Sequence, residues 1–268
     1  MSRKGSQGHR RRHGAGRGDR RRHESASPGS PPDLVVGLHA VRGIIDRTPA
    51  RARGLYVWRE DTERAALARD AERHGVAVHA GPPPDDLGSE APHTQGVACR
   101  VAPFGYTSLD ALLPRCDRPD TRLLVLDSIT DARNLGAILR AAAFFAVTGV
   151  IIPRDRAADV TPVVERVARG GAAGMPIAKV VNLARTLVAL EDAGVTSVGT
   201  VISDDSVELR EVDAERPLAI VLGAEDRGLR RLVAERCSLR AHLSGSAAMA
   251  SLNVSAFAAV ALATLDRR

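Results

Sequence analysis

The apolar residues of this chain occur in two kinds of pattern that alternate along its length. Short continuous runs, such as residues 123–126 (LLVL) and 218–222 (LAIVL), are typical of strands that are buried on both faces. Between the runs lie segments whose apolar residues recur every three or four positions, such as residues 183–192, as in amphipathic helices. This alternation predicts an α/β fold in which a mainly parallel sheet is covered by helices on both faces.

The same patterns predict where the individual elements lie. The predicted strands cover residues 55–58, 77–80, 96–101, 123–126, 149–152, 198–202 and 218–222. The predicted helices cover residues 37–46, 62–74, 134–145, 162–169, 183–192, 229–236 and 251–266. Asp61 or Thr62 is the expected cap of the second helix.

Composition changes divide the 268 residues into four segments. Residues 1–32 form an Arg-, Gly- and Ser-rich tail that ends in PGSPP, residues 33–105 form a small α/β domain, residues 106–120 form a linker, and residues 121–268 form a larger α/β domain. The small domain presents no catalytic constellation. Polar residues follow the predicted strands of the large domain, which is where ligands bind in open α/β sheets.

The positive charge of the chain is concentrated in the tail. Residues 1–32 contain nine basic and two acidic residues, which gives them a charge of +7. The remaining residues carry −1, and the net charge of the whole chain is +6. A tail of this composition is expected to be disordered. It is interpreted either as an arm that contacts RNA or DNA phosphates or as a solubilising extension.

Several classes of protein are disfavoured by composition. Aromatic residues make up only 3% of the chain, which argues against a nucleic-acid binder built on stacking platforms. The three cysteines, Cys99, Cys116 and Cys237, lie far apart and form neither a disulfide framework nor a metal-binding CxxC motif. The uncharged run 141–152 is too short for a membrane span, and no apolar segment of a secretory signal follows the first arginines. We therefore expect a cytoplasmic protein without a metal or a membrane partner.

The first segment that can carry chemistry is DSITDARNLGAILR, residues 127–140. Asn134 is expected to start a helix after the strand that ends at Asp127, and Arg140 lies about one and two-thirds turns further along. Gly136 permits close approach of another backbone. The alternative interpretation is that Asn134 is an N-cap and that Arg140 is a solvated charge.

Two further polar segments follow in the large domain. Residues 222–229 (LGAEDRGL) place Gly223 after a strand and Glu225 in a turn, without the GxGxxG or Walker pattern, which disfavours a nicotinamide or nucleoside-triphosphate enzyme. Residues 243–253 (LSGSAAMASLN) bring Ser251 and Asn253 to the entry of a long apolar helix. Either of these two residues would also serve as a plain N-cap of that helix.

Together the three segments resemble the SpoU (TrmH-like) family of RNA ribose 2′-O-methyltransferases, within the SPOUT superfamily. The matching motifs are NLGAILR (134–140), LGAEDRG (222–228) and SLNVS (251–255), in the order in which that family has them. GLHAV (37–41) and VNLARTL (181–187) are similar to the branch that methylates a guanosine ribose in 23S rRNA. The resemblance covers most of residues 33–268 and leaves the tail unmatched.

The resemblance implies a site, a cofactor, a fold and partners. The matched catalytic positions are Asn134, Arg140, Glu225, Ser251 and Asn253. The positions matched to the S-adenosylmethionine site are Thr200, Gly223, Leu243 and Leu252. The family implies a trefoil knot in the SPOUT domain, a homodimer, an RNA substrate, and an N-terminal substrate-binding domain like ribosomal protein L30e.

One motif departs from the family pattern. Where the family usually has Ile-Pro-Met, this chain has Leu243, Ser244 and Gly245, and Ala247 replaces a usual glycine. Loss of the proline frees φ and restores a backbone N–H at Ser244. The cofactor loop is therefore expected to have an altered geometry.

The implied chemistry and its alternatives can be stated in terms of these residues. Arg140 would stabilise the negative charge that develops on the ribose oxygen, while Asn134, Ser251 and Asn253 orient the hydroxyl and Glu225 fixes the loop. The alternatives are a tRNA methyltransferase or an antibiotic-resistance rRNA methyltransferase of the same family, and a non-catalytic RNA-binding protein of ribosome assembly.

Overall fold

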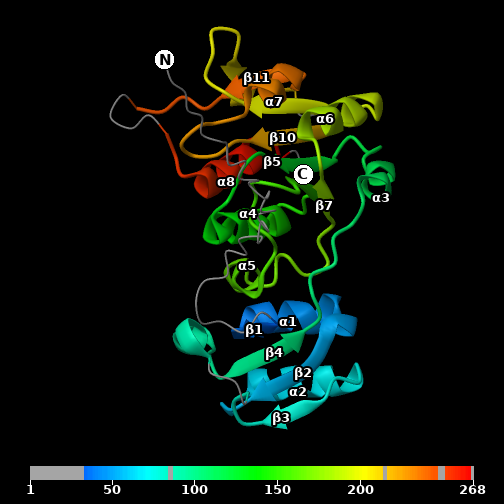
Figure 1. Ribbon diagram of the computed structural model, residues 1–268, viewed down its shortest axis with the longest axis vertical. Coiled ribbons are helices and arrows are strands. Elements are labelled where there is room, and N and C mark those ends of the chain that lie inside the picture. The colour runs from blue at the N-terminus through cyan, green and yellow to red at the C-terminus, as the bar shows by residue number, and fades with distance from the viewer. Residues whose placement is uncertain (1–32, 84–86, 214–215, 247–250, 267–268) are drawn as a thin grey trace, which may run out of the picture.

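The computed structural model describes residues 33–83, 87–213, 216–246 and 251–266. The predicted tail at 1–32 and the departure at Ala247 lie outside the described residues. The described chain forms two α/β units, of which the N-terminal one lies at the lower end of Figure 1 and the C-terminal one at the upper end. None of the helices in these ranges is long and apolar enough to cross a membrane.

The N-terminal unit contains a four-stranded sheet with the order β1-β4-β2-β3. Its strands are β1 (Leu34–Val36), β2 (Ala52–Val57), β3 (Val78–Ala80) and β4 (Val97–Val101). Two helices, α1 (Leu38–Arg47) and α2 (Thr62–Arg73), pack against the sheet. The pairs β1–β4 and β2–β4 are antiparallel, whereas β2 and β3 are parallel.

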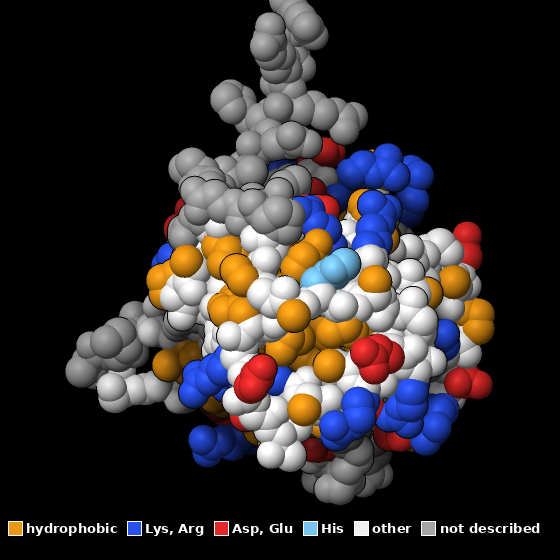
Figure 2. Space-filling view, turned by 90° about the horizontal axis from the view of Figure 1, so that it is seen from below, with side chains coloured by type: hydrophobic (Ala, Val, Ile, Leu, Met, Phe, Trp, Pro, Cys, Tyr) orange, Lys and Arg blue, Asp and Glu red, His pale blue; other side chains and the backbone are white. Residues whose placement is uncertain are grey.

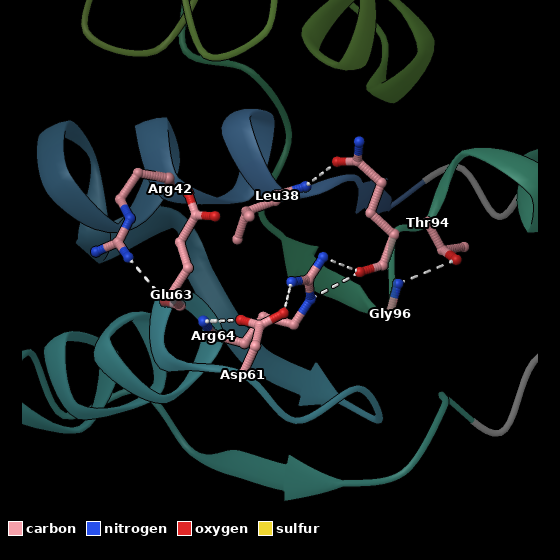
Figure 3. Close-up of polar contacts among 8 residues, drawn as sticks. Leu38, Arg42, Asp61, Glu63, Arg64, Thr94 and Gly96 are labelled. Atoms are coloured by element: carbon pink, nitrogen blue, oxygen red, sulfur yellow. Dashed lines mark hydrogen bonds and ion pairs between the residues drawn. The ribbon is translucent and has the colours of Figure 1, made fainter.

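A polar network fixes the loop that precedes β4 (Figure 3). The side-chain oxygen of Gln95 accepts a hydrogen bond from the backbone N–H of Leu38 at 3.1 Å, so it takes the place of a cap at the start of α1. The buried Arg64 guanidinium donates to the Gln95 carbonyl and to Asp61. Asp61 also accepts from the backbone N–H of Arg64, which confirms it as the cap of α2.

The C-terminal unit is built on a seven-stranded sheet with the order β7-β6-β5-β10-β8-β11-β9, in which every pair is parallel. The strands are β5 (Arg122–Leu126), β6 (Gly149–Pro153), β7 (Ile177–Val180), β8 (Thr196–Thr200), β9 (Val207–Glu208), β10 (Leu218–Leu222) and β11 (Leu239–His242). The helices are α3 (Leu109–Leu112), α4 (Ala132–Phe144), α5 (Pro162–Val167), α6 (Leu183–Asp192), α7 (Arg231–Arg236) and α8 (Val254–Thr264).

Both faces of this sheet are covered, as the sequence predicts. Apolar side chains of α4, α5 and α8 join one buried cluster, and those of α3, α6 and α7 join another on the opposite face. Gly136 in α4 lies against α5, where an added Cβ would come within 2.6 Å of Val167. Leu112 of α3 is fully buried, so the segment that leads out of the N-terminal unit packs against the sheet.

Several element boundaries differ from the sequence prediction. The predicted helix start at Asn134 is wrong, because α4 begins at Ala132 and Asp131 caps it by accepting from the N–H groups of Arg133 and Asn134. The predicted strand at 198–202 is β8, shifted to Thr196–Thr200, and the last helix begins at Val254 rather than at residue 251. The prediction missed β1, β7, β9 and β11, which are two to four residues long and too short for a clear periodicity.

The two units meet at a close interface, here called the seam. On the N-terminal side it contains α1, the residues after α1, and Glu90. On the C-terminal side it contains α5 and the loop that follows α5. Arg51 donates two hydrogen bonds to the carboxylate of Glu165, at 2.8 and 3.1 Å, and Arg166 pairs with Glu90 at 2.6 Å. An added Cβ on Gly43 would lie 2.7 Å from the Cα of Gly170, so the backbones touch there. The seam thus combines buried ion pairs with direct backbone contact.

Candidate active site

A cavity of about 470 Å³ opens at the carboxyl ends of β8, β10 and β11. All four residues that the resemblance assigns to the cofactor line it: Thr200, Gly223, Leu243 and Leu252. These residues are brought together from positions spread over more than fifty residues because parallel strands end at one edge of the sheet. The volume falls within the range of about 300–1,000 Å³ that is common for small-molecule sites.

Two of these four residues also have structural roles. The hydroxyl of Thr200 donates to the carbonyl of Val221 at 2.9 Å and so joins β8 to β10 below the cavity. A Cβ on Gly223 would lie 2.2 Å from the carbonyl carbon of Gly228. The tight loop from Gly223 to Gly228 therefore requires glycine at its first position, whether or not a ligand is bound.

A cluster of three polar side chains lies beside the cavity and is here called the amide cluster. The side-chain nitrogen of Asn253 donates to the side-chain oxygen of Asn134 at 3.1 Å and to the carboxylate of Glu225 at 3.3 Å. The three residues come from the three motif segments, which lie up to 119 positions apart in the chain. Glu225 lines both the cavity and a neighbouring hollow of about 380 Å³ that Asn134 also lines.

Asn253 performs two functions at once. Its side-chain oxygen accepts from the backbone N–H of Ser255 at 2.9 Å and caps α8, as the plain N-cap interpretation expects. Its side-chain nitrogen remains available for the amide cluster. Asn134, by contrast, caps nothing, because Asp131 is the cap of α4, and its side chain faces the cluster.

The other two candidate catalytic residues lie outside this cluster. Ser251 is exposed and lines the cavity. Arg140 is exposed on α4 and has no hydrogen-bond or ion-pair partner among the residues that the structure describes. Six residues of helix separate it from Asn134, a rise of about 9 Å and a rotation of about 240°. A single chain therefore does not bring Arg140 to the amide cluster.

Comparison with known proteins identifies the family. Residues 121–263, more than half of the chain, match the model of the SpoU rRNA Methylase family. The chain belongs to this family. It is 38% identical over 236 residues to the 23S rRNA (guanosine-2′-O-)-methyltransferase RlmB of Shewanella oneidensis. The aligned region covers 86% of this chain and 95% of that protein.

Solved structures agree at the level of the fold. The SpoU methyltransferase AviRb of Streptomyces viridochromogenes superposes with a TM-score of 0.72 at 22% identity, over 88% of each chain. The AdoMet-bound rRNA methyltransferase of Sinorhizobium meliloti superposes with a TM-score of 0.68 at 21% identity, over 88% of this chain and 87% of that one. The α/β architecture with its seven-stranded parallel sheet is thus that of SpoU methyltransferases.

One residue that supports the SpoU site was not among the candidates from the sequence. Asp127 is fully buried at the end of β5, and its carboxylate accepts from the backbone N–H of Arg230 at 2.8 Å and from the Arg230 guanidinium at 2.6 Å. It thereby ties the end of β5 to the chain just after the Gly223–Gly228 loop. The sequence signal was an acidic residue directly after a continuous apolar strand, where a solvated side chain is the usual expectation.

The departure from the SpoU pattern at Ser244 has a structural counterpart. The restored N–H of Ser244 donates to the carboxylate of Glu208, at 3.1 Å to one oxygen and 3.4 Å to the other. Leu243, Ser244 and Gly245 still line the cavity. The residues present therefore fit a nucleoside-containing cofactor, since Leu243, Leu252 and other apolar side chains form the wall and backbone groups of the loops supply polar contacts.

Proposed function

We propose that this protein transfers the methyl group of S-adenosylmethionine to the 2′-hydroxyl of a guanosine ribose in 23S rRNA. The observation that carries the proposal is the amide cluster, formed by one residue from each motif, beside a cavity lined by all four expected cofactor residues. The guanosine and 23S rRNA assignments rest on relatives that are 38% identical over nearly their whole length.

S-adenosylmethionine, when bound, supplies an activated methyl group on a positively charged sulfur. What remains for the protein is to hold a weakly nucleophilic ribose hydroxyl in line with that methyl carbon and to ease loss of its proton. Alignment alone is worth up to about 7–11 kcal/mol. The amides of Asn134 and Asn253 and the carboxylate of Glu225 offer hydrogen-bond donors and acceptors for this purpose, with Ser251 at the cavity wall.

Arg140 supplies the positive charge for the developing alkoxide in this proposal, and it does so across a homodimer. A guanidinium stays protonated at neutral pH and stabilises negative charge as a hydrogen-bond donor rather than acting as a base. The exposed position of Arg140, away from its own amide cluster, supports delivery to the cluster of a second copy. Phe144, which is 81% exposed one helical turn further along α4, gives this face of the helix a large apolar side chain suited to pairing.

We also propose the trefoil knot and the L30e-like role of the N-terminal unit. The knot is supported by the strand order, in which the late strand β11 lies between the earlier β8 and β9.

An RNA-binding role for residues 33–105 is supported by exposed arginines such as Arg53, Arg59 and Arg69. Figure 2 views the molecule from that end and shows Lys and Arg side chains, with Asp and Glu side chains among them, around a central group of hydrophobic ones. A ribosomal RNA substrate implies action in the cytoplasm.

A methyl-transfer assay with purified protein tests the proposal. The protein is incubated with tritiated S-adenosylmethionine and, in separate reactions, with unmodified 23S rRNA transcript and with bulk tRNA. Label on a guanosine ribose of the 23S transcript is the expected result. Label on tRNA alone would favour the tRNA alternative, and binding of RNA without any label would favour the non-catalytic assembly protein.

A further inference from the structure

Glu208 lies beside the cofactor cavity without lining it. It belongs to β9, a two-residue strand at the edge of the seven-stranded sheet, and it is paired in register with His242 of β11. Directly after His242 the chain enters the segment from Leu243 to Ser246, which forms one wall of the cavity. Because β9 is so short, its backbone ladder alone holds little of this edge in place.

Side chains at this edge compensate for the short ladder. The Glu208 carboxylate accepts from the N–H of Ser244 at 3.1 Å and lies 3.7 Å from the ring nitrogen Nε2 of His242. The other ring nitrogen of His242 is 2.9 Å from the hydroxyl of Ser206, which donates to the carbonyl of Ser203 at 2.7 Å. Residues 203–208 and 242–244 are thus joined by contacts on both sides of the histidine ring.

The charge state of Glu208 suits this role. Hydrogen bonds from the Ser244 hydroxyl lower the pKa of Glu208, and the Ser244 N–H and the neighbouring His242 lower it further. The carboxylate is therefore ionised throughout the neutral range, and hydrogen bonds to an ionised acceptor are about twice as strong as neutral ones. The loop that lacks the family's proline gains an anchor through the N–H that proline would not have.

We propose that Glu208 is a positioning residue of the S-adenosylmethionine site. It acts through Ser244, by holding the backbone of the wall segment, Leu243 to Ser246, in the conformation that receives the cofactor. This inference rests on the proposed function, since it takes the cavity to be the cofactor site. When Glu208 is removed, the wall segment becomes free to move, and binding of the cofactor must order it again.

Cofactor binding by the purified full-length chain tests this role. Isothermal titration with S-adenosylmethionine compares the wild type with Glu208→Ala, Glu208→Gln and the control Glu211→Ala, which removes an exposed carboxylate three residues away. We expect a dissociation constant about five- to tenfold higher for Glu208→Ala, about two- to threefold higher for Glu208→Gln, whose amide oxygen still accepts, and an unchanged one for Glu211→Ala. With RNA saturating, KM for the cofactor rises in Glu208→Ala while kcat stays within about twofold.

A double-mutant cycle isolates the contact with Ser244. In a Ser244→Pro background, which lacks both the N–H and the hydroxyl that Glu208 accepts from, Glu208→Ala should raise the dissociation constant by less than about twofold more. Additive effects of the two substitutions would contradict the inference, as would wild-type affinity in Glu208→Ala. Loss of the thermal unfolding transition in Glu208→Ala would also contradict it, because it would show that the residue closes the sheet edge instead. If the wild type binds no S-adenosylmethionine, the proposed function itself fails, and this result is distinct from equal binding by wild type and variant.

Discussion

The seam between the two units and the amide cluster of the active site use polar side chains in opposite ways. At the seam, Glu165 is only 4% exposed and its two oxygens are both held by Arg51. In the amide cluster, Asn253 makes contacts of 3.1 and 3.3 Å to Asn134 and Glu225 in exposed surroundings. Burial closes the first arrangement to a ligand, while the second leaves lone pairs and N–H groups exposed.

This difference separates structural roles from chemical ones. Buried charges that lose their partner are left unpaired at high cost, so the seam is expected to govern stability. Exposed amides and carboxylates contribute little to stability, so the cluster is expected to govern activity. Substitutions at the two places should therefore have separable effects on stability and on activity.

The largest expected effect is on stability at the seam. Glu165→Ala leaves Arg51 largely buried without its carboxylate and should lower the free energy of unfolding by about 3–5 kcal/mol, measured by urea denaturation. The control is Asp120→Ala, which removes an exposed ion pair with Arg118 and should cost less than about 1 kcal/mol. Equal losses in the two variants would remove the distinction.

The next effect is on activity alone. Arg140→Ala should reduce methyl transfer at least about 100-fold, equivalent to about 2.7 kcal/mol of transition-state stabilisation, because it removes the charge that stabilises the alkoxide. Arg133→Ala, on the exposed part of the same helix, is the matched control. Cofactor affinity and melting temperature should stay at wild-type values, and full activity in the Arg140 variant would overturn its assignment.

Asn253 allows capping and chemistry to be separated at one residue. Asn253→Asp keeps the oxygen that caps α8 but loses the N–H groups that reach Asn134 and Glu225, so we expect about tenfold less activity with stability near wild type. Asn253→Ala loses both and should in addition cost about 1 kcal/mol of stability. Methyl-transfer rates and urea denaturation of the two variants check this, and wild-type activity of Asn253→Asp would show that Asn253 is only a cap.

The smallest expected effect concerns the tail, whose sequence carries +7. Deletion of residues 1–32 should weaken RNA binding several-fold at physiological salt, because fewer phosphate counterions are released. The slope of log affinity against log salt should flatten by about 0.7–0.9 for each lost phosphate contact. Filter-binding titrations at several salt concentrations measure both quantities, and an unchanged slope would favour a solubilising extension.

The fold followed from local sequence patterns where those patterns were long. Continuous apolar strands such as β5 and β10 predicted the buried parallel sheet, and the acidic residue before α2 predicted its cap. The short strands β9 and β11 could not be predicted. They contain only two and four residues, which is too few for an alternation of apolar and polar side chains to be recognised. The start of α4 was misplaced because Asp131 and Asn134 are both good capping residues. The structure shows that Asp131 has the extended backbone conformation of a cap, whereas Asn134 already lies within the helix.

The site was accessible to sequence reasoning only in part. Asn134, Glu225 and Asn253 stood out because they lie in motifs that follow predicted strands or precede helices. Asp127 and Glu208 did not, because an acidic residue after a strand is usually solvated and the contacts of these two residues join segments 103 and 36 residues apart. The relation of Arg140 to the amide cluster depends on how chains associate, which no local pattern specifies.

Mapping ribose methylation in ribosomal RNA from cells with and without this gene measures whether the protein methylates a ribosomal guanosine. We predict that one guanosine of 23S rRNA loses its 2′-O-methyl group when the gene is deleted. The wild-type gene should restore the methyl group, and the Arg140→Ala gene should not. Identical methylation maps in the two strains would show that this protein is not the methyltransferase of a ribosomal guanosine.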